Sequence, residues 1–472
     1  MRKIFMGTAI MAVFVCLIFG VLFLKGQLNS LQGLPSVKNA IAPEVDEVRI
    51  DEEYMNFYDL DAFETSLPVF FINTEGQKLS NEIATMGRCS VLNFEDDGNM
   101  HSIYDKPDIS MNVGVKLRGA SSYNFDKRQY RLTFFKDEYG TKKMDYDFFG
   151  MGYADSWVLN GPFLDKTLAR NYMVYALGAE MMDWAPECKY VELFVDGRYK
   201  GVYLLIEPIS VGPGRLDLSS YGLLSGKTAY IVSRDREGTD FDPLQNYGKL
   251  HGFTSNDLYV DYPGSKSITP AEYKWINDDI SLFEMALYGE DYKDERLGYA
   301  EYIDVDNFVD YYILNEVVMN HDAGNLSTFA YKEINGKLKM VIWDFNNCYD
   351  NYQWFTEDFD EFYVAEMAWF NRLLTDRAFV DKVVSRYYEL RQGTLSEEHM
   401  YSVLDEADTI LGEAIDRNFS VWGYTFRKNL LVGSGRDIRS YDSAREQLRS
   451  SIEKRFEFLD EHITDLYELC EG

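Results

Sequence analysis

The sequence predicts an α+β fold, in which a β-rich first half is followed by a mostly helical second half. Short alternating apolar patterns bounded by turn residues continue to about residue 206, which is typical of strands. From about residue 270 to 469, apolar residues recur at helical spacing. With 46% hydrophobic and 15% aromatic residues, the chain is expected to be folded rather than disordered.

The N-terminus predicts one transmembrane helix ahead of this fold. Arg2 and Lys3 precede an uncharged stretch that runs from Ile4 to Leu24, and Lys25 follows it. This stretch matches the roughly 20 helical residues that cross a bilayer. Because positive residues stay in the cytoplasm, the rest of the chain is expected outside it, held at the cell membrane. A cleaved signal peptide, and hence a secreted protein, is the alternative.

We therefore expect four segments and a restricted set of partners. The segments are an anchor or signal at 1–25, a polar linker at 26–65, a β-rich lobe at 66–207 and a helical lobe at 208–472. The net charge of −31 repels polyanions, which excludes nucleic acid as a partner and favours basic proteins and divalent cations. Four cysteines lie outside the predicted span, with spacings that fit neither a zinc site nor a redox pair. We expect buried thiols, with disulfides as the alternative.

The strands of the first half follow from alternation and turn signals. They are expected at 67–72, 89–94, 113–118, 129–135, 190–195 and 200–206. The last two are joined by Asp196-Gly197, a strong hairpin signal. The region at 209–265 is expected to be mainly loop, with one strand at 229–232.

The helices follow from apolar periodicity and capping residues. The first is expected at 166–182, with Asp165 as its N-cap. The others are expected at 270–288, 305–319, 363–390, 396–419 and 440–469.

Two aspartates flank a predicted hairpin late in the chain. Asp322 follows the helix at 305–319, and Asp344 follows an apolar run of strand type. A helix, an acidic loop, two short strands and then Asp-Phe is the order found in protein-kinase-like phosphotransferases. In that order, the first Asp takes the proton of the acceptor hydroxyl and the second holds magnesium on the nucleotide phosphates. Taken singly, each residue would be interpreted as a turn aspartate.

Cationic residues surround a polar turn in the first half. Arg118, Lys127, Arg128 and Arg131 lie near Ser121-Ser122 in an otherwise acidic chain. Such a cluster suits nucleotide phosphates, and ion pairing at the surface is the alternative. The chain has no GxxxxGK[ST], GxGxxG, HExxH or GxSxG motif, so the Arg-Gly-x-Ser-Ser turn is the candidate phosphate-binding loop.

Five blocks of residues then occur in a specific order. They are Leu117–Ser122 with Phe125, Lys127, Tyr130 and Leu132; Trp157–Asn160 with Asp165, Arg170 and Asn171; Tyr190–Gly197; Gly201–Glu207; and Asn315, Glu316, Asn320 and Asp322 with Trp343–Phe345. In these blocks the chain resembles the CotH family, the spore coat protein H type of atypical secreted kinases. The resemblance covers roughly residues 65–465.

The resemblance implies a kinase-like bilobal fold and a kinase that transfers phosphate from ATP to Ser or Thr of proteins outside the cytoplasm or in a coat. Asp322 would be the catalytic base, and Asp344 would bind Mg²⁺ or Mn²⁺. The candidates for nucleotide contacts are Arg118, Ser121, Ser122, Lys127, Arg131, Arg170 on the first helix and Glu207 at the hinge near the adenine. The acceptor protein is expected to be basic and rich in Ser or Thr.

Two positions depart from the family pattern. A second acid often follows the metal-binding Asp, and Asn346 takes its place here, with an oxygen that can bind magnesium but no charge. The Asn expected just before the strand at Phe329 is replaced by Ser327, with Asn325 two residues earlier, so both are candidate ligands. We therefore keep two hypotheses, an active kinase and a non-catalytic envelope or coat assembly protein that retains the fold. A carbohydrate-active enzyme, suggested by paired acids and many aromatic residues, is a weaker third.

Overall fold

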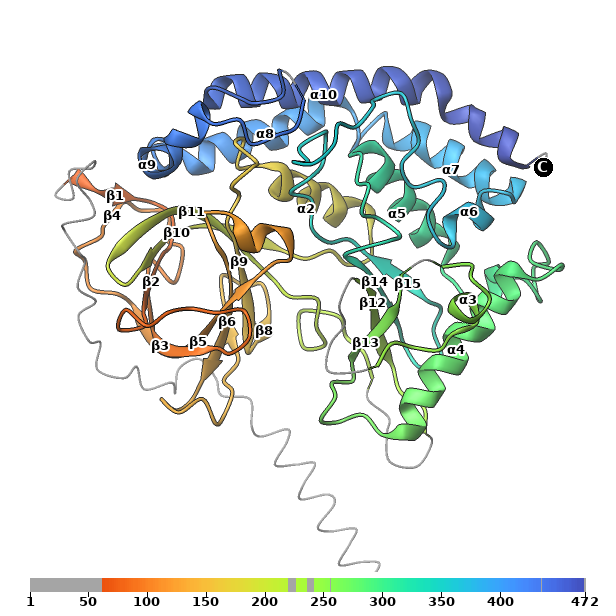
Figure 1. The fold of residues 1–472 in the computed structure, drawn as a ribbon, viewed down its shortest axis with the longest axis horizontal. Helices are drawn as coiled ribbons and strands as arrows, with labels where there is room; N and C mark the ends of the chain where they lie inside the picture. Colours follow the sequence, from red (N-terminus) through yellow and green to blue (C-terminus); the bar gives the residue numbers. More distant parts are fainter. Residues whose placement is uncertain (1–61, 220–225, 236–241, 255, 434, 471–472) are drawn as a thin grey trace, which may run out of the picture. The chain divides into compact units, whose positions relative to one another are not determined.

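The expected α+β fold is confirmed, with strands concentrated before residue 207 and helices after it (Figure 1). The structure is a computed structural model that describes residues 62–219, 226–235, 242–254, 256–433 and 435–470, all of which belong to one compact unit. The predicted anchor at 1–25 and most of the linker at 26–65 lie outside the described residues. Within the described ranges, no helix is both long and apolar enough to cross a bilayer.

Seven strands of the first half close into a barrel in the order β10-β11-β9-β6-β5-β3-β2. Their bounds are β2 Val69–Asn73, β3 Thr85–Leu92, β5 Ile109–Arg118, β6 Gln129–Phe135, β9 Ser156–Asn160, β10 Cys188–Val195 and β11 Arg198–Ile206. The parallel pair β2 and β10 closes the barrel, and the other neighbours are antiparallel. Alternate side chains fill its interior, as along β6, where Tyr130, Leu132 and Phe134 are buried while Arg131 points outward and is exposed.

The hairpin predicted at Asp196-Gly197 is confirmed, because both residues have positive φ angles of 50° and 73° between β10 and β11. Two two-stranded sheets accompany the barrel, β1 (Glu64–Thr65) with β4 (His101–Ser102) and β7 (Tyr146–Asp147) with β8 (Tyr153–Ala154). The end of the expected linker is therefore part of the fold. Phe63, just before β1, is buried against Phe194 and Tyr199, which accounts for the difference.

A second sheet has the strand order β13-β12-β14-β15. Its bounds are β12 Tyr230–Arg234, β13 Leu258–Tyr262, β14 Thr328–Lys332 and β15 Lys339–Val341. The single strand expected in 209–265 is corrected to two, because β13 pairs antiparallel with β12. The two short strands expected between Asp322 and Asp344 are confirmed as β14 and β15.

Of the expected helices, the one at 270–288 is found with the same bounds. The helices are α2 Arg170–Met181, α3 Tyr247–Leu250, α4 Pro270–Tyr288, α5 Val305–Val317, α6 Phe370–Leu373, α7 Arg377–Leu390, α8 Glu397–Leu411, α9 Ala414–Trp422 and α10 Tyr441–His462. A capping box between Thr269 and Glu272 begins α4, with Pro270 in its first turn. These are local signals, which is why sequence alone locates this helix.

The helix expected at 166–182 begins only at Arg170, so Asp165 is not its N-cap. The Asp165 carboxylate instead accepts hydrogen bonds from the N–H of Thr167 at 3.1 Å and of Arg170 at 3.0 Å. These bonds hold the preceding residues in a turn in which Leu168 has a φ of 59°. Asp165 thus supports the start of α2 from five positions away.

Three other helices also differ from expectation. The helix expected at 363–390 is found as α6 and α7. It begins only at Phe370, because the N–H groups of Tyr363 and Val364 donate to the Glu316 carboxylate and Trp369, just before α6, has a φ of 73°. The helix expected at 396–419 is interrupted at Gly412, which has a φ of 45° between α8 and α9. The helix expected at 440–469 ends at His462 and continues as a 3₁₀-helix over Ile463–Cys470.

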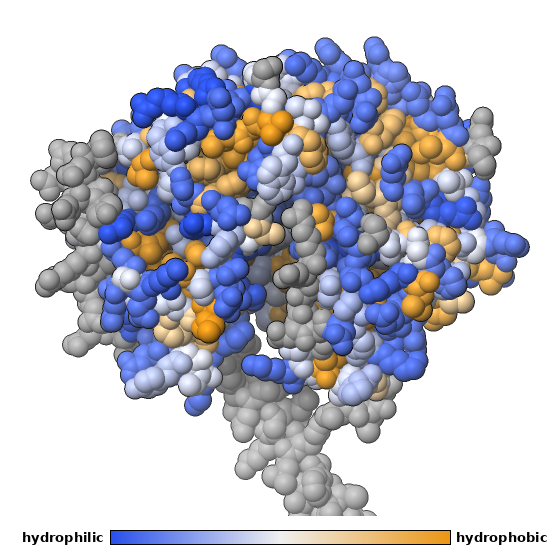
Figure 2. All heavy atoms as spheres, viewed as in Figure 1, coloured by the Kyte–Doolittle hydropathy of each residue, from blue (hydrophilic) through white to orange (hydrophobic). Residues whose placement is uncertain are grey.

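The surface and the cysteines agree with the composition. Figure 2 shows that hydrophilic side chains cover much of the face drawn, with hydrophobic side chains in scattered groups, as a net charge of −31 suggests. Cys89, Cys188, Cys348 and Cys470 are unpaired thiols, of which Cys89 and Cys348 are fully buried. The expectation of buried thiols is confirmed for Cys89 and Cys348, whereas Cys188 and Cys470 are half-buried thiols.

A buried ion pair connects the end of α5 to α10. Arg455 Nη2 lies 2.7 Å from Glu316 Oε1, and both side chains are at most 1% exposed. Arg455 also donates to the carbonyls of Phe359 at 2.8 Å and Glu361 at 2.7 Å. Burial raises the pKa of Glu316, and the Arg455 charge opposes this rise. The pair therefore joins α5, α10 and the segment before α6.

Replacing Arg455 by alanine is expected to destabilise the protein by about 3–5 kcal/mol, because it leaves the Glu316 carboxylate buried and uncompensated. Urea unfolding measures the effect. The control is Lys382→Ala, which removes an exposed ion pair in which the Lys382 and Asp306 side chains are 52% and 80% exposed. This change should lower the free energy of unfolding by less than about 1 kcal/mol. An equal effect of the two changes would contradict the structural role of the buried pair.

Candidate functional site

A cavity of about 590 Å³ gathers half of the site residues that the sequence singled out. Its walls come from the end of β5 and the turn after it, the loop after α5, the residue before β14 and the loop after β15. The predicted residues that line it are Arg118, Ser122, Asp322, Ser327, Asp344 and Asn346. Residues separated by more than two hundred positions thus meet in one place.

Asp322 lies in a tight loop that begins after α5. Its carbonyl accepts from the N–H of Asn325 at 3.0 Å and of Leu326 at 2.7 Å, and its own N–H donates to Asn320 Oδ1 at 3.3 Å. The Gly324 carbonyl accepts from Arg234 Nη1 at 2.8 Å, and Arg234 is 1% exposed. The loop is therefore held from both sides, with the Asp322 side chain 21% exposed at the cavity.

Arg234 has no motif that would have identified it from the sequence. It lies in β12 with its guanidinium 4.6 Å from the centre of the Trp369 ring. Burial lowers its pKa, and the negative charge of Glu284 opposes this change. Its effect on the site is indirect, because it orients the loop that carries Asp322.

Asp344 follows β15 with a φ of 60°, a left-handed conformation that non-glycine residues seldom adopt. A chain of amide hydrogen bonds holds it from α2. The Phe345 N–H donates to Asn171 Oδ1 at 2.8 Å, and Asn171 Nδ2 donates to Asn346 Oδ1 at 2.9 Å. Asn346 Nδ2 then donates to Asp344 Oδ1 at 2.6 Å.

The direction of these hydrogen bonds decides whether Asn346 turns its side-chain oxygen or its nitrogen to Asp344. Because the Phe345 N–H can only donate, Asn171 must turn its oxygen to it and its nitrogen to Asn346. Asn346 then turns its own oxygen to Asn171 and its nitrogen to Asp344. In this arrangement Asn346 is a hydrogen-bond donor to Asp344, and its oxygen is engaged elsewhere.

Arg118 ends β5 and is half-buried beside the Trp343 ring, at 5.6 Å from its centre. Burial lowers its pKa, and the nearby Asp344 charge opposes this change. Gly119 follows with a φ of +101°, and a Cβ there would stand 1.9 Å from Ser122 Oγ. Glycine is therefore required for the turn that brings Ser122 to the cavity, and Ser121 begins the 3₁₀-helix Ser121–Asn124.

The cationic cluster expected around this turn does not converge on the cavity. Lys127 is 1% exposed, and its amine donates to Asn418 Oδ1 at 2.8 Å and lies 5.1 Å from the Tyr203 ring centre. Arg131 lies outside the barrel and is exposed. Among the described residues that line the cavity, Arg118 is the sole Lys or Arg.

Three other predicted residues also lie outside the lining. Arg170 is 3% exposed; its Nη1 contacts Asp165 Oδ1 at 2.6 Å, and its Nε donates to the Cys348 carbonyl at 2.9 Å, so it holds the loop after β15. Glu207 is 1% exposed and pairs with Arg215 at 3.6 Å. The Asn325 side-chain oxygen accepts from Asn256 Nδ2 at 2.6 Å, whereas Ser327 faces the cavity.

The lining also contains residues that sequence reasoning did not assign to the site. They are acidic, amide or aromatic: Asp165, Asp235, Asn347, Phe163, Phe329 and Tyr352. From the sequence, Asp165 is predicted as a helix cap and belongs to the second of the five blocks, and Asp235 belongs to no motif. Asp165 is compensated by its buried ion pair with Arg170, and Asp235, Asp322 and Asp344 oppose the single Arg118, which makes the lining acidic. An anion would therefore enter with cations that neutralise it.

The donor set fits a divalent metal ion that arrives with phosphate oxygens. In the described part of the chain, no three His, Cys, Asp or Glu side chains lie close enough to hold a metal by themselves. Mg²⁺ in nucleotide sites is commonly bound by one or two carboxylates together with substrate phosphates. Asp344 supplies such a carboxylate, and the oxygens of Ser327 and Asn347 line the same cavity.

Comparison with protein families gives a match over most of the chain. A family model described as CotH kinase protein matches residues 115–459. The match begins within β5 and includes Arg118, Asp322 and Asp344. It leaves out the strands β2 to β4, which the expected range of roughly 65–465 had included. A comparison with curated proteins finds no match.

Glu207 is expected to make stability depend on pH. Burial raises the pKa of Glu207 to about 7 from an ordinary 4.5. Between pH 4.5 and 7, Glu207 is therefore protonated in the folded protein and ionised in the unfolded chain. Its contribution to the free energy of unfolding is fully present below pH 4.5 and is lost as the pH rises through 7. Glu207→Gln should remove a dependence on the order of 3 kcal/mol between pH 4.5 and 7.5, measured by urea unfolding. Glu413→Gln, at a side chain that is 83% exposed, should leave the dependence intact.

Asn346→Asp is expected to raise the affinity for Mn²⁺ at least about tenfold, because it adds a carboxylate beside Asp344. Isothermal titration calorimetry with Mn²⁺ alone measures the change. The control is Asn429→Asp, which adds the same charge at an exposed position outside the cavity. An unchanged affinity in Asn346→Asp would show that this position does not reach the bound metal.

Proposed function

The chain belongs to the CotH kinase protein family, and from this premise we propose that it is an extracytoplasmic protein kinase held at the cell membrane by its N-terminus. The kinase transfers the γ-phosphate of ATP to Ser or Thr of surface or coat proteins and depends on Mg²⁺ or Mn²⁺. The observation that carries the proposal is the convergence of Asp322, Asp344 and Arg118 on one cavity. Elements 109–118, 305–317 and 339–341 deliver these residues to it.

In this proposal the fold is used as two lobes. The barrel and α2, within 66–207, form the lobe that carries Arg118 and the Gly119 turn. Residues 208–472 form the lobe that carries Asp322 and Asp344. Each lobe supplies part of the cavity wall, as in kinases where nucleotide and acceptor meet between lobes.

The residues then take distinct parts in phosphoryl transfer. The Asp322 carboxylate accepts the proton of the acceptor hydroxyl. Asp344 holds the divalent metal, with Ser327 and Asn347 as further oxygen ligands. Arg118 lies beside Asp344 and contacts phosphate oxygens, since phosphoryl transfer is catalysed mainly by positioning and charge neutralisation. When bound, Mg²⁺–ATP supplies the transferable phosphoryl group and the positive charge that neutralises it.

The acidic character of the chain supports the choice of acceptor and metal. Four aspartates and one arginine line the cavity, so a nucleotide enters it with its charge reduced by divalent cations. The net charge of −31 attracts a basic acceptor and disfavours nucleic acid. We therefore propose a basic protein rich in Ser or Thr as the substrate.

A non-catalytic assembly protein is the second candidate function. The observation that favours it is Asn346, which stands where a second acid is expected and turns its nitrogen to Asp344. Such a site retains nucleotide binding with weak or absent transfer. The two candidates differ in one measurable property, which is turnover.

The purified full chain is expected to transfer labelled γ-phosphate to a basic, Ser-rich test protein in the presence of Mn²⁺. Asp322→Ala should lower kcat by about 10²–10⁴-fold and leave ATP binding intact, because it removes the proton acceptor alone. Asp344→Ala should abolish Mn²⁺-dependent ATP binding, measured by calorimetry.

The control for both changes is Asp306→Ala, at an exposed side chain of α5, which should keep full activity. Transfer that survives in Asp344→Ala would refute the assigned roles. ATP binding without any turnover by the unaltered chain would favour the assembly protein.

A further inference from the structure

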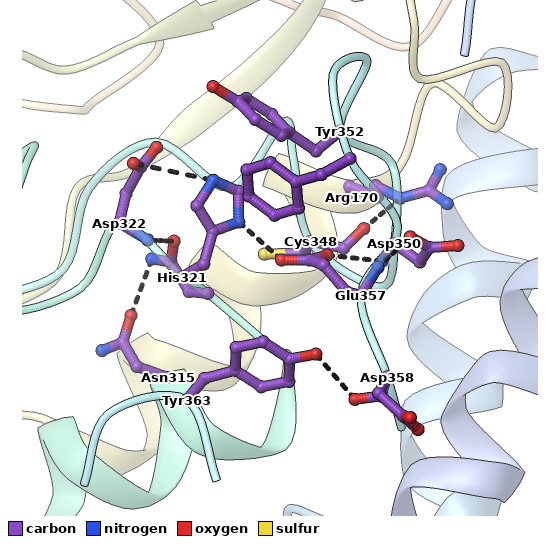
Figure 3. A network of polar contacts seen from close by, with 12 residues as sticks. Arg170, Asn315, His321, Asp322, Cys348, Asp350, Tyr352, Glu357, Asp358 and Tyr363 are labelled. Carbon is purple, nitrogen blue, oxygen red and sulfur yellow. Dashed lines mark hydrogen bonds and ion pairs between the residues drawn. The ribbon is translucent and has the colours of Figure 1, made fainter. Parts of the chain in front are cut away.

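The side chain next to the proposed base lies between two carboxylates (Figure 3). His321 Nδ1 is 2.6 Å from Glu357 Oε1, and His321 Nε2 is 3.7 Å from Asp322 Oδ1. The imidazole is 13% exposed, with the Tyr352 and Phe355 rings at 4.5 and 5.1 Å between centres. An acid at each ring nitrogen indicates that His321 has an electrostatic part in the site besides its packing against the two aromatic rings.

Glu357 is built into the fold as a fixed, buried carboxylate. Its side chain is fully buried, and its Oε2 accepts from the Asp350 N–H at 3.0 Å. The Glu357 N–H in turn donates to Asp350 Oδ1 at 2.7 Å, and the Asp350 carboxylate pairs with Arg436 at 2.8 Å. Burial raises the pKa of Glu357, and its hydrogen bond to His321 opposes this rise.

The two carboxylates select one charge state of the ring. An ionised carboxylate only accepts hydrogen bonds, so each ring nitrogen that faces one is best served by an N–H. A neutral imidazole has a single N–H and would turn a lone pair to one of the acids. The doubly protonated ring donates from Nδ1 to Glu357 at 2.6 Å, and its positive charge then lies within ion-pair distance of the Asp322 carboxylate, 3.7 Å from Nε2.

We propose that His321, held and charged by Glu357, is a positioning residue for Asp322: the imidazolium keeps the Asp322 carboxylate ionised and oriented at the cavity before the acceptor hydroxyl arrives. This inference rests on the proposed function, because it gives Asp322 the part of proton acceptor. It adds two residues, His321 and Glu357, to the base without placing either in contact with substrate.

Several other titratable groups lie near the ring among the described residues. Cys348, Asp350, Tyr352 and Tyr363 lie near His321 and Glu357 (Figure 3), and Arg436 pairs with Asp350. Burial raises the pKa of the Cys348 thiol and of the Tyr363 hydroxyl, so both are neutral at physiological pH. Arg436 neutralises Asp350. Asp322 and Glu357 are the acids that contact the ring itself.

The first test measures the charge of His321 directly. The chain has five histidines, so selective ¹³C labelling at Cε1 gives a small set of NMR signals, and His321→Gln identifies the one that belongs to residue 321. In Glu357→Gln the titration midpoint of His321 should fall by about one unit or more, since an adjacent negative charge is lost. Asp322→Asn should lower it in the same direction.

The matched control is Glu180→Gln, which removes the acid that lies 2.7 Å from His399 at the surface. It should lower the titration midpoint of His399 and leave that of His321 unchanged. A His321 midpoint that stays within a few tenths of a unit in both Glu357→Gln and Asp322→Asn would overturn the proposed coupling.

The second test is the pH profile of phosphotransfer by the full chain with Mn²⁺ and ATP. The acid limb should report ionisation of Asp322 and the alkaline limb deprotonation of His321. Glu357→Gln should move the alkaline limb to lower pH, and His321→Gln should move the acid limb to higher pH, with ATP binding unchanged. A purely structural role would change the amplitude of the profile and not its limbs.

Absence of transfer by the unaltered chain would overturn the proposed function and, with it, the role of His321. An active chain whose two limbs are the same in Glu357→Gln and His321→Gln, with both variants folded by thermal unfolding, would overturn the role of His321 alone.

Discussion

The buried ion pair between Arg455 and Glu316 is the constraint on which the site depends. Glu316 lies at the end of α5, just before the loop that carries Asp322. Its carboxylate also accepts from the N–H groups of Tyr363 and Val364, while Arg455 bonds the Phe359 and Glu361 carbonyls. Removing the two charges from water costs free energy, and these hydrogen bonds offset that cost only when the three segments are in this arrangement. The segment held in this way, from Phe359 to Val364, begins two residues after Glu357, and the Glu357 side chain contacts His321.

A second, independent support acts on Asp344. Arg170 and Asn171, at the start of α2, hold the loop after β15 through the Cys348 carbonyl, the Phe345 N–H and the Asn346 amide. The two aspartates are thus oriented by different parts of the chain, α5 for Asp322 and α2 for Asp344. Their joint presence at the cavity depends on the packing of the barrel side of the molecule against the helices, which bonds such as Lys127 to Asn418 secure.

Much of the fold and part of the candidate site were predictable from the sequence, because they depend on residues that are close together in the chain. The α4 bounds and the turn between β10 and β11 depend on residues within a few positions of one another, Thr269 with Glu272 and Asp196 with Gly197. The helix expected at 363–390 begins only at Phe370, because the distant Glu316 carboxylate accepts from the N–H groups of Tyr363 and Val364 and holds this stretch in another conformation. Local propensity is decisive where no such long-range partner competes.

The sequence by itself determined the α+β class, the family, the two aspartates and the Gly119 turn, because each is encoded in neighbouring residues or in an ordered motif. The tertiary structure alone decided that Arg118 faces the cavity while Lys127 is buried against Asn418. It also decided that Asn346 turns its nitrogen to Asp344, and that Glu357 meets His321. These outcomes depend on contacts between residues far apart in the chain, whose charge and orientation are set by burial and by hydrogen-bond partners that no local pattern specifies.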